Sequence, residues 1–361
     1  MSEFFSALFP SPLLAVSAAA AILGVLFGIL AESSQLCLLG GMREARDGKS
    51  QRRLASYGIA VLAALAATQA LVAAGLLDLS ASVYLATVTA LPAVVIGGLL
   101  FGFGAALTRG CAGRLTILAA TGNLRALLVV VVLGLVAYAT MRGILAPVRL
   151  PIEDIAKPAK AYADLGSSLG ANGRFIIAAL ASLASLALLR RAGWKLGLAA
   201  IAIGLTIAAG WFASARLGDD GFDKLQPWSA AFVAPIGNGL QYLLTFTGSK
   251  INFGIAFAGG VLGGAFVSAL IGGRLKLQSF ETPRQTLRYL AGASLMGFGG
   301  ILALGCTTGQ GMSGIATLAP ASFVALAAIA TGMWAGLLYD AGKQNAVAGY
   351  VPETAFVPAG E

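Results

Sequence analysis

Apolar runs of membrane-spanning length dominate the chain and are separated by short polar stretches. A bilayer with a hydrocarbon core of about 30 Å needs roughly 20 residues of helix to cross it. The runs lie at about 13–31, 54–77, 91–108, 125–146, 175–190, 197–213, 253–272, 289–304 and 322–339. The pattern therefore predicts an all-α integral membrane protein with about nine transmembrane helices.

Two further apolar patches are too short to cross a bilayer. The first covers residues 32–41 and contains Cys37; the second, interrupted by Gly and Pro, covers residues 235–240 and takes the same place in the second half. Irregular backbone at membrane depth is tolerated where it is buried in protein or lines a wet cavity. We expect these patches, and the short apolar pieces after Cys111 and Cys306, to form short re-entrant helices.

An internal repeat relates the two halves of the chain. Residues 101–111 and 296–306 align without a gap at an offset of 195 positions. The matching pairs are Gly102 with Gly297, Phe103 with Phe298, Gly104 with Gly299, Gly110 with Gly305 and Cys111 with Cys306. This spacing predicts two copies of one membrane unit, each with a cysteine at a matching break in a helix. The glycines also have a simpler interpretation, which is close packing of helices in lipid.

Charge in the loops predicts how the two copies are oriented. Lys and Arg are in excess at 42–53, 190–195 and 273–288, and such an excess marks cytoplasmic loops. This places the N-terminus in the periplasm and the C-terminus in the cytoplasm. We predict a first repeat at 1–146, a periplasmic loop with a linker span at 147–196, and an inverted second repeat at 197–361. Inverted repeats with interrupted helices that meet near the midplane are a transporter architecture.

Composition restricts the class of protein further. The chain has 361 residues, of which 58% are hydrophobic and 11% charged, and its mean hydropathy is +0.86. Soluble domains carry about 25% charged residues, so a soluble protein is excluded. The net charge of +9 fits basic cytoplasmic loops or a preference for anions. No basic run is interleaved with aromatic residues, so nucleic acid is not an expected partner.

The chain has three cysteines and no histidine. The cysteines have no C-x-x-C spacing and no histidine to share a metal ion, which argues against a metal site. Catalysis by a Ser-His-Asp triad is excluded, and no phosphate-binding P-loop motif is present. We therefore expect a protein that is not an enzyme and that needs no cofactor.

The residues after Cys111 and Cys306 are small or carry hydroxyl groups, which favours the start of a helix. A helix N-terminus offers free N–H groups and partial positive charge, which suit an anion. Two such ends that face each other predict an anion path with a thiol on each side. Burial of cysteine as a small hydrophobic residue is the alternative. Arg109 and Arg114, which flank Cys111, either attract an anion or anchor the end of a span. Glu32 is the best candidate for an intramembrane carboxylate, or it is simply an interfacial acid.

Three segments together resemble the YeeE/YedE family of bacterial inner-membrane proteins, over nearly the whole chain. They are Leu36-Cys37 after the first span, Arg109-Gly110-Cys111-Ala112-Gly113, and Gly305-Cys306-Thr307-Thr308-Gly309-Gln310-Gly311. The resemblance implies an hourglass-like pore in the inner membrane that takes up thiosulfate. Thiosulfate is then expected to hydrogen-bond to the thiols of Cys37, Cys111 and Cys306 in turn. We expect N–H groups around Gly110, Gly113, Thr307 and Thr308 to share the desolvation cost of the dianion.

Other functions remain open on the sequence. The first is uptake of another sulfur species or a selenium species. The second is a membrane sulfurtransferase, in which a cysteine takes sulfane sulfur covalently as a persulfide; this needs an activated thiolate beside a basic group, and Arg109 near Cys111 is the hint. The third is a docking platform for a small TusA-like cytoplasmic sulfur carrier, which the family resemblance suggests.

Overall fold

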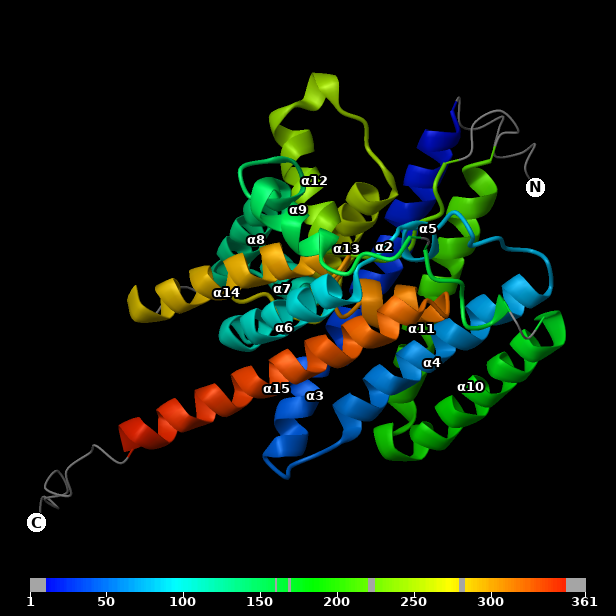
Figure 1. Ribbon diagram of the computed structural model, residues 1–361. Coiled ribbons are helices and arrows are strands. Elements are labelled where there is room, and N and C mark those ends of the chain that lie inside the picture. The colour runs from blue at the N-terminus through cyan, green and yellow to red at the C-terminus, as the bar shows by residue number, and fades with distance from the viewer. Residues whose placement is uncertain (1–10, 160, 168–169, 220–224, 279–282, 349–361) are drawn as a thin grey trace, which may run out of the picture.

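The computed structural model describes residues 11–159, 161–167, 170–219, 225–278 and 283–348 (Figure 1). No β-strand occurs among these residues, where an isolated bridge joins Asn123 to Gln278. The helices, in chain order, are α2 (Pro12–Ser34), α3 (Leu38–Arg46), α4 (Arg52–Ala73), α5 (Val83–Ala86), α6 (Leu91–Thr108), α7 (Ala112–Ala120), α8 (Leu124–Arg142), α9 (Ala146–Asp154), α10 (Gly170–Ala192), α11 (Trp194–Leu217), α12 (Val233–Leu244), η2 (Phe246–Gly248), α13 (Phe253–Ile271), α14 (Pro283–Leu302), η3 (Gly309–Gly314) and α15 (Pro320–Ala348). The all-α class predicted from the sequence is confirmed.

Eight candidate membrane spans are found among the described residues. They are Pro12–Arg46, Arg52–Ala73, Leu91–Ala120, Leu124–Arg142, Gly170–Ala192, Trp194–Leu217, Phe253–Ile271 and Pro320–Ala341. Each overlaps one predicted span. The remaining prediction, at 289–304, falls on α14, a helix of 20 residues. Because its first turns carry Arg284, Gln285 and Arg288, α14 is less apolar than the eight.

The short apolar patches give rise to the short helices α3 and α12, whose first turns are buried. Cys37 is the N-cap residue of α3, Cys111 that of α7, and Phe232 that of α12. In the second half the segment after Cys306 forms η3, one turn of π-helix whose residues are all buried. Single π-turns are rare and occur frequently at functional sites. The interior therefore holds several helix ends, where backbone N–H groups lack partners within their own helix.

The long helices pack in pairs that cross between the two halves of the chain. Helix α2 packs on α13 and α11 packs on α4, while α6 lies against both α15 and α14, and α14 against α8 (Figure 1). Glycines bring these backbones close together, as expected for helices in lipid. A Cβ atom added at Gly264 of α13 would lie only 2.1 Å from the carbonyl oxygen of Val25 in α2. These contacts fix the positions of the short helices between the pairs.

Candidate functional site

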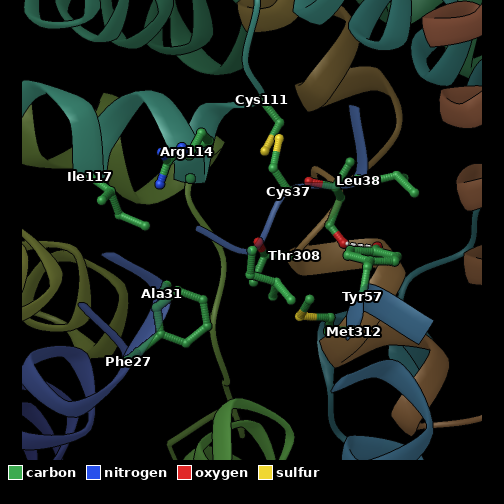
Figure 2. Close-up of a pocket in the computed structure, with 13 residues that line it drawn as sticks. Phe27, Ala31, Cys37, Leu38, Tyr57, Cys111, Arg114, Ile117, Thr308 and Met312 are labelled. Atoms are coloured by element: carbon green, nitrogen blue, oxygen red, sulfur yellow. Dashed lines mark hydrogen bonds between the residues drawn. The ribbon is translucent and has the colours of Figure 1, made fainter. Parts of the chain in front are cut away.

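A small cavity lies where α2, α3, α4, α7 and η3 meet (Figure 2). Its lining residues come from both halves of the chain and are Phe27, Ala31, Leu36, Cys37, Leu38, Tyr57, Cys111, Gly113, Arg114, Ile117, Thr307, Thr308 and Met312. Most of them are apolar, and the polar groups among them are thiols, hydroxyls and one guanidinium. We call this space the cysteine cavity.

Cys37 enters the cavity because α2 ends abruptly before it. Gln35 adopts a left-handed backbone conformation with φ of 51°, which stops α2. The chain then extends through Cys37, whose Sγ accepts a hydrogen bond from the backbone N–H of Gly40 at 3.4 Å. The thiol thus takes the role of a capping side chain, and α3 holds it in place.

Cys111 reaches the same point from a matching break. Arg109 ends α6 with a left-handed φ of 60°, and α7 starts directly after Cys111. The Cys111 thiol lies close enough to the Cys37 thiol, the Thr307 hydroxyl and Arg114 to interact with each of them. Figure 2 shows the two sulfur atoms pointing toward each other. Two thiols and one hydroxyl therefore converge on one face of the cavity.

Cys306 lies behind this face and is fully buried. The helix break before Cys306 repeats the geometry of the break before Cys111. Leu304, at the position equivalent to Arg109, also has a left-handed backbone, with φ of 55°. The Cys306 Sγ accepts a hydrogen bond from the backbone N–H of Gly309 at 3.4 Å. Cys306 is not among the cavity-lining residues, so the structure brings two of the three cysteines into one cavity and sets the third next to it.

Tyr57 joins the surroundings of all three thiols. It is buried at the cavity wall and close enough to Cys37, Cys111 and Cys306 to interact with each of them electrostatically. Its hydroxyl donates a hydrogen bond of 2.8 Å to the backbone carbonyl of Thr307. This bond ties α4 in the first half to the segment that follows Cys306 in the second.

The cysteine cavity is narrow. It leaves about 20 Å³ for the centres of water molecules, and one water needs about 10–15 Å³ of such space. An anion with several heavy atoms therefore does not fit unless the lining side chains move. Met312 and Tyr57 close one side (Figure 2), and methionine is the more adaptable of the two because its unbranched side chain has three rotatable bonds.

A second cavity opens beside the first and is strongly basic. It is lined by Glu32, Gln35, Arg114, Ile117, Leu118, Thr121, Asn123, Arg274, Lys276 and Gln278. The Glu32 carboxylate accepts two hydrogen bonds from Arg274, at 2.9 and 2.6 Å, and one from the Ser268 hydroxyl at 2.7 Å. The hydrogen bond to Glu32 and its negative charge raise the pKa of Arg274, so this guanidinium stays charged.

The predicted site residues divide into three groups. Gly113, Thr307 and Thr308 line the cysteine cavity with Cys37 and Cys111, whereas Gly110 and Gly305 sit in the helix breaks next to their cysteines. Arg109 lines a separate cavity with Arg125 and Tyr289.

Phe27, Tyr57 and Met312 line the cavity without any signal in the sequence that singles them out, whereas Arg114 was expected as one of two arginines that flank Cys111.

No metal-binding cluster of His, Cys, Asp or Glu is found in the part of the chain that the structure describes.

Comparison with known proteins gives one family and two curated relatives. A family model described as sulphur transport matches residues 33–335. The thiosulfate transporter TsuA of Escherichia coli K12 is 25% identical over 342 residues, which cover 87% of this chain and 91% of the relative. The thiosulfate transporter TsuA of Spirochaeta thermophila is 27% identical over 335 residues, covering 87% and 96%.

Proposed function

The chain belongs to the sulphur transport family, and from this premise we propose that it takes up thiosulfate into the cytoplasm across the bacterial inner membrane. Both curated relatives bear the name of a thiosulfate transporter and match along most of this chain. The observation that carries the proposal is the pairing of the Cys37 and Cys111 thiols at the wall of a buried cavity, with Cys306 directly behind.

The proposed mechanism passes the anion from thiol to thiol. A neutral thiol is a weak hydrogen-bond donor, and conduction requires binding that is weak enough for the ion to leave. Hydroxyl groups of Thr307 and Thr308 lie at the same cavity and offer further donors. Successive weak donors then replace the hydration shell of a dianion, whose removal from water would otherwise be very costly.

We further propose that the chain is built from two inverted repeats around an hourglass-like pore, with α14 as a ninth transmembrane helix. The exchange of partners supports this: α2 packs on α13, and their counterparts α11 and α4 also pack on each other. Left-handed residues at equivalent positions, Arg109 and Leu304, support it as well. The basic loops favour a periplasmic N-terminus and a cytoplasmic C-terminus.

The cavity dimensions imply that the pore is closed in this conformation. Passage of thiosulfate requires the wall at Met312 to open, while the hydrogen bond from Tyr57 keeps Thr307 joined to α4. Alternating access in transporters of inverted repeats proceeds by movement of one unit against the other around a fixed site. The path through the cysteines then opens first on one side and later on the other.

The test is growth of a bacterium that lacks sulfate uptake, with thiosulfate as the sole sulfur source. The wild-type chain should restore growth, and Cys37→Ser, Cys111→Ser and Cys306→Ser should not, although each is present in the membrane. Absence of growth with a well-expressed wild type would redirect the proposal to another sulfur or selenium species. Full growth with all three variants would return the cysteines to a packing role.

Mass spectrometry separates transport from sulfur transfer. In a sulfurtransferase the Cys111 thiolate would attack the outer sulfur of thiosulfate, break its S–S bond and release sulfite. Cys111 would then be a persulfide, and the mass of the protein would rise by one sulfur atom. The transport proposal expects an unmodified thiol. A stable adduct would contradict simple transport and favour the enzyme.

A further inference from the structure

We propose that the basic cavity beside the cysteine cavity is a second binding site for a small divalent oxyanion, and that Arg114 draws the anion from the thiols into it. We call this space the arginine chamber and define it by Glu32, Arg114, Arg274 and Lys276. The inference rests on the proposed function in one respect, because it assumes that the anion arrives through the cysteine cavity.

The two cavities are neighbours and share two lining residues. Arg114 and Ile117, on successive turns of α7, line both of them. Arg114 belongs to the first turn of α7, just after Cys111, and Figure 2 shows its guanidinium extending from the side of the two thiols toward Ile117. Its charge acts on Cys37 and Cys111 on one side and on Glu32 on the other. An anion that leaves the thiols on this side meets Arg114 first.

Arg114 is free to bind an anion. Among the described residues its guanidinium has no hydrogen-bond or ion-pair partner, whereas Arg274 is held by both oxygen atoms of Glu32. A guanidinium offers a planar fork of donors that matches an oxyanion with two parallel hydrogen bonds. An arginine without a partner in a partly enclosed cavity therefore provides the strongest available position for such a ligand.

The charge of the arginine chamber matches a dianion. Three basic side chains, Arg114, Arg274 and Lys276, face one carboxylate, Glu32, so two positive charges remain uncompensated. The chamber is also larger: the space open to the centres of water molecules is about 150 Å³, against about 20 Å³ in the cysteine cavity. It can thus hold the ion with part of its hydration shell, which lowers the cost of leaving the narrow path.

Glu32 sets how tightly the chamber binds. Its carboxylate occupies Arg274, and Ser268 fixes it in that position. An anion in the chamber is therefore attracted by the full charge of Arg114, whereas the charge of Arg274 is partly compensated by Glu32. Conduction needs a site from which the ion can leave, and the ion pair keeps the second arginine from holding it. Removal of the Glu32 charge should bind the anion more tightly and release it more slowly.

The first experiment measures uptake of radiolabelled thiosulfate by the full chain in proteoliposomes. Arg114→Gln should slow uptake about tenfold, because a charge-assisted hydrogen bond is lost. Arg114→Lys should take up thiosulfate faster than Arg114→Gln, because lysine keeps the positive charge. Glu32→Gln should lower both the KM and the maximal rate. The matched control is Arg191→Gln, which removes an exposed arginine at the end of α10 and should leave uptake unchanged. Uptake by Arg114→Gln at the wild-type rate would overturn the inference.

The second experiment detects the site without transport. It uses the protein with all three cysteines replaced by serine and measures the shift of the unfolding temperature produced by inorganic sulfate or thiosulfate. Either ion should stabilise this protein, Arg114→Gln should remove the shift, and Glu32→Gln should enlarge it. A shift that Arg114→Gln leaves intact would contradict the site, and so would the absence of any shift.

The two experiments distinguish this inference from the proposed function. If the wild type does not transport thiosulfate but the Arg114-dependent shift is present, the proposed function fails and the site stands. If the wild type transports thiosulfate but Arg114→Gln changes neither uptake nor the shift, the site fails and the proposed function stands. Should Arg114→Gln fold poorly, Glu32→Gln decides the question. The site predicts that this variant lowers the KM for thiosulfate uptake and enlarges the shift of the unfolding temperature, and absence of both effects would contradict it.

Discussion

The thiols of Cys37 and Cys111 lie next to each other although each belongs to a different helix break. Cys37 precedes α3 and Cys111 precedes α7, so two helix N-termini converge on one pair of sulfur atoms (Figure 2). All three cysteines are free thiols in this structure. The pair is therefore positioned both to donate weak hydrogen bonds to an anion and to react with each other under oxidation.

Oxidation should join Cys37 to Cys111 and stop transport. Diamide accepts one hydrogen from each thiol and becomes the hydrazine, while a disulfide bond forms between the two sulfur atoms. We expect uptake of thiosulfate to fall to background after this treatment and to recover with dithiothreitol. Peptide mass spectrometry should find a cross-link between residues 37 and 111, with Cys306 unmodified.

Single serine variants supply the control for the cross-link. Neither Cys37→Ser nor Cys111→Ser can form it, whereas Cys306→Ser should form it as readily as the wild type does. A cross-link between Cys306 and Cys111 in preference to the expected one would contradict the arrangement described above.

Tyr57→Phe should weaken the contact between α4 and the segment after Cys306. The variant leaves the buried carbonyl of Thr307 without the donor that lies 2.8 Å away, and a buried group without its partner costs about 1–3 kcal/mol. The unfolding temperature of the purified protein should fall measurably. Tyr162→Phe, at an exposed tyrosine, serves as the control, and an equal unfolding temperature for both variants would argue against this role of Tyr57.

Two neighbouring glycines of α13 should respond in opposite ways to a methyl group. A Cβ at Gly264 would lie 2.1 Å from the carbonyl oxygen of Val25, whereas a Cβ at Gly263 meets nothing within 4 Å. Gly264→Ala should therefore push α13 away from α2, at a cost of about 1–3 kcal/mol typical of overpacking. Gly263→Ala should be neutral or stabilising by about 0.5–1 kcal/mol, because alanine favours the helix. Thermal unfolding in detergent measures both.

Much of the fold was predictable from the sequence, because an apolar run long enough to cross a bilayer indicates a transmembrane helix. The Gly-Cys repeat also predicted the matching breaks, since the equivalent residues Arg109 and Leu304 share a left-handed backbone. Helix α14 is a less clear case: an apolar run at 289–304 predicted a span there, but the first turns of the helix are polar. Its packing against α6 and α8 places it in the bundle.

The composition of the cavity wall was less predictable, because it depends on which side of a turn each residue faces. Arg109 and Arg114 flank Cys111 in the sequence, but Arg109 ends α6 and lines a separate cavity, while Arg114 lies in the first turn of α7 and lines the cysteine cavity. Tyr57 and Phe27 reach the cavity from long helices whose sequence shows no local signal at those positions. Contacts between segments far apart in the chain determine which side chains line the cavity, and these contacts cannot be read from a single sequence.

Gly113 and Phe232 should show compensating substitutions. Phe232 takes the place in the second half that Cys37 has in the first, and its fully buried ring packs on Phe27 and Phe257. A Cβ added at Gly113 would lie 2.9 Å from that ring, so Gly113→Ala should destabilise the protein by about 1–3 kcal/mol and slow uptake. Phe232→Leu removes the clashing edge. The double variant should then unfold at a higher temperature than the sum of the two single effects predicts, because residues in direct contact are energetically coupled. If the effects of the two substitutions on the unfolding temperature were strictly additive, the Phe232 ring would have moved aside for the added methyl group, and the cavity wall at Gly113 would be deformable.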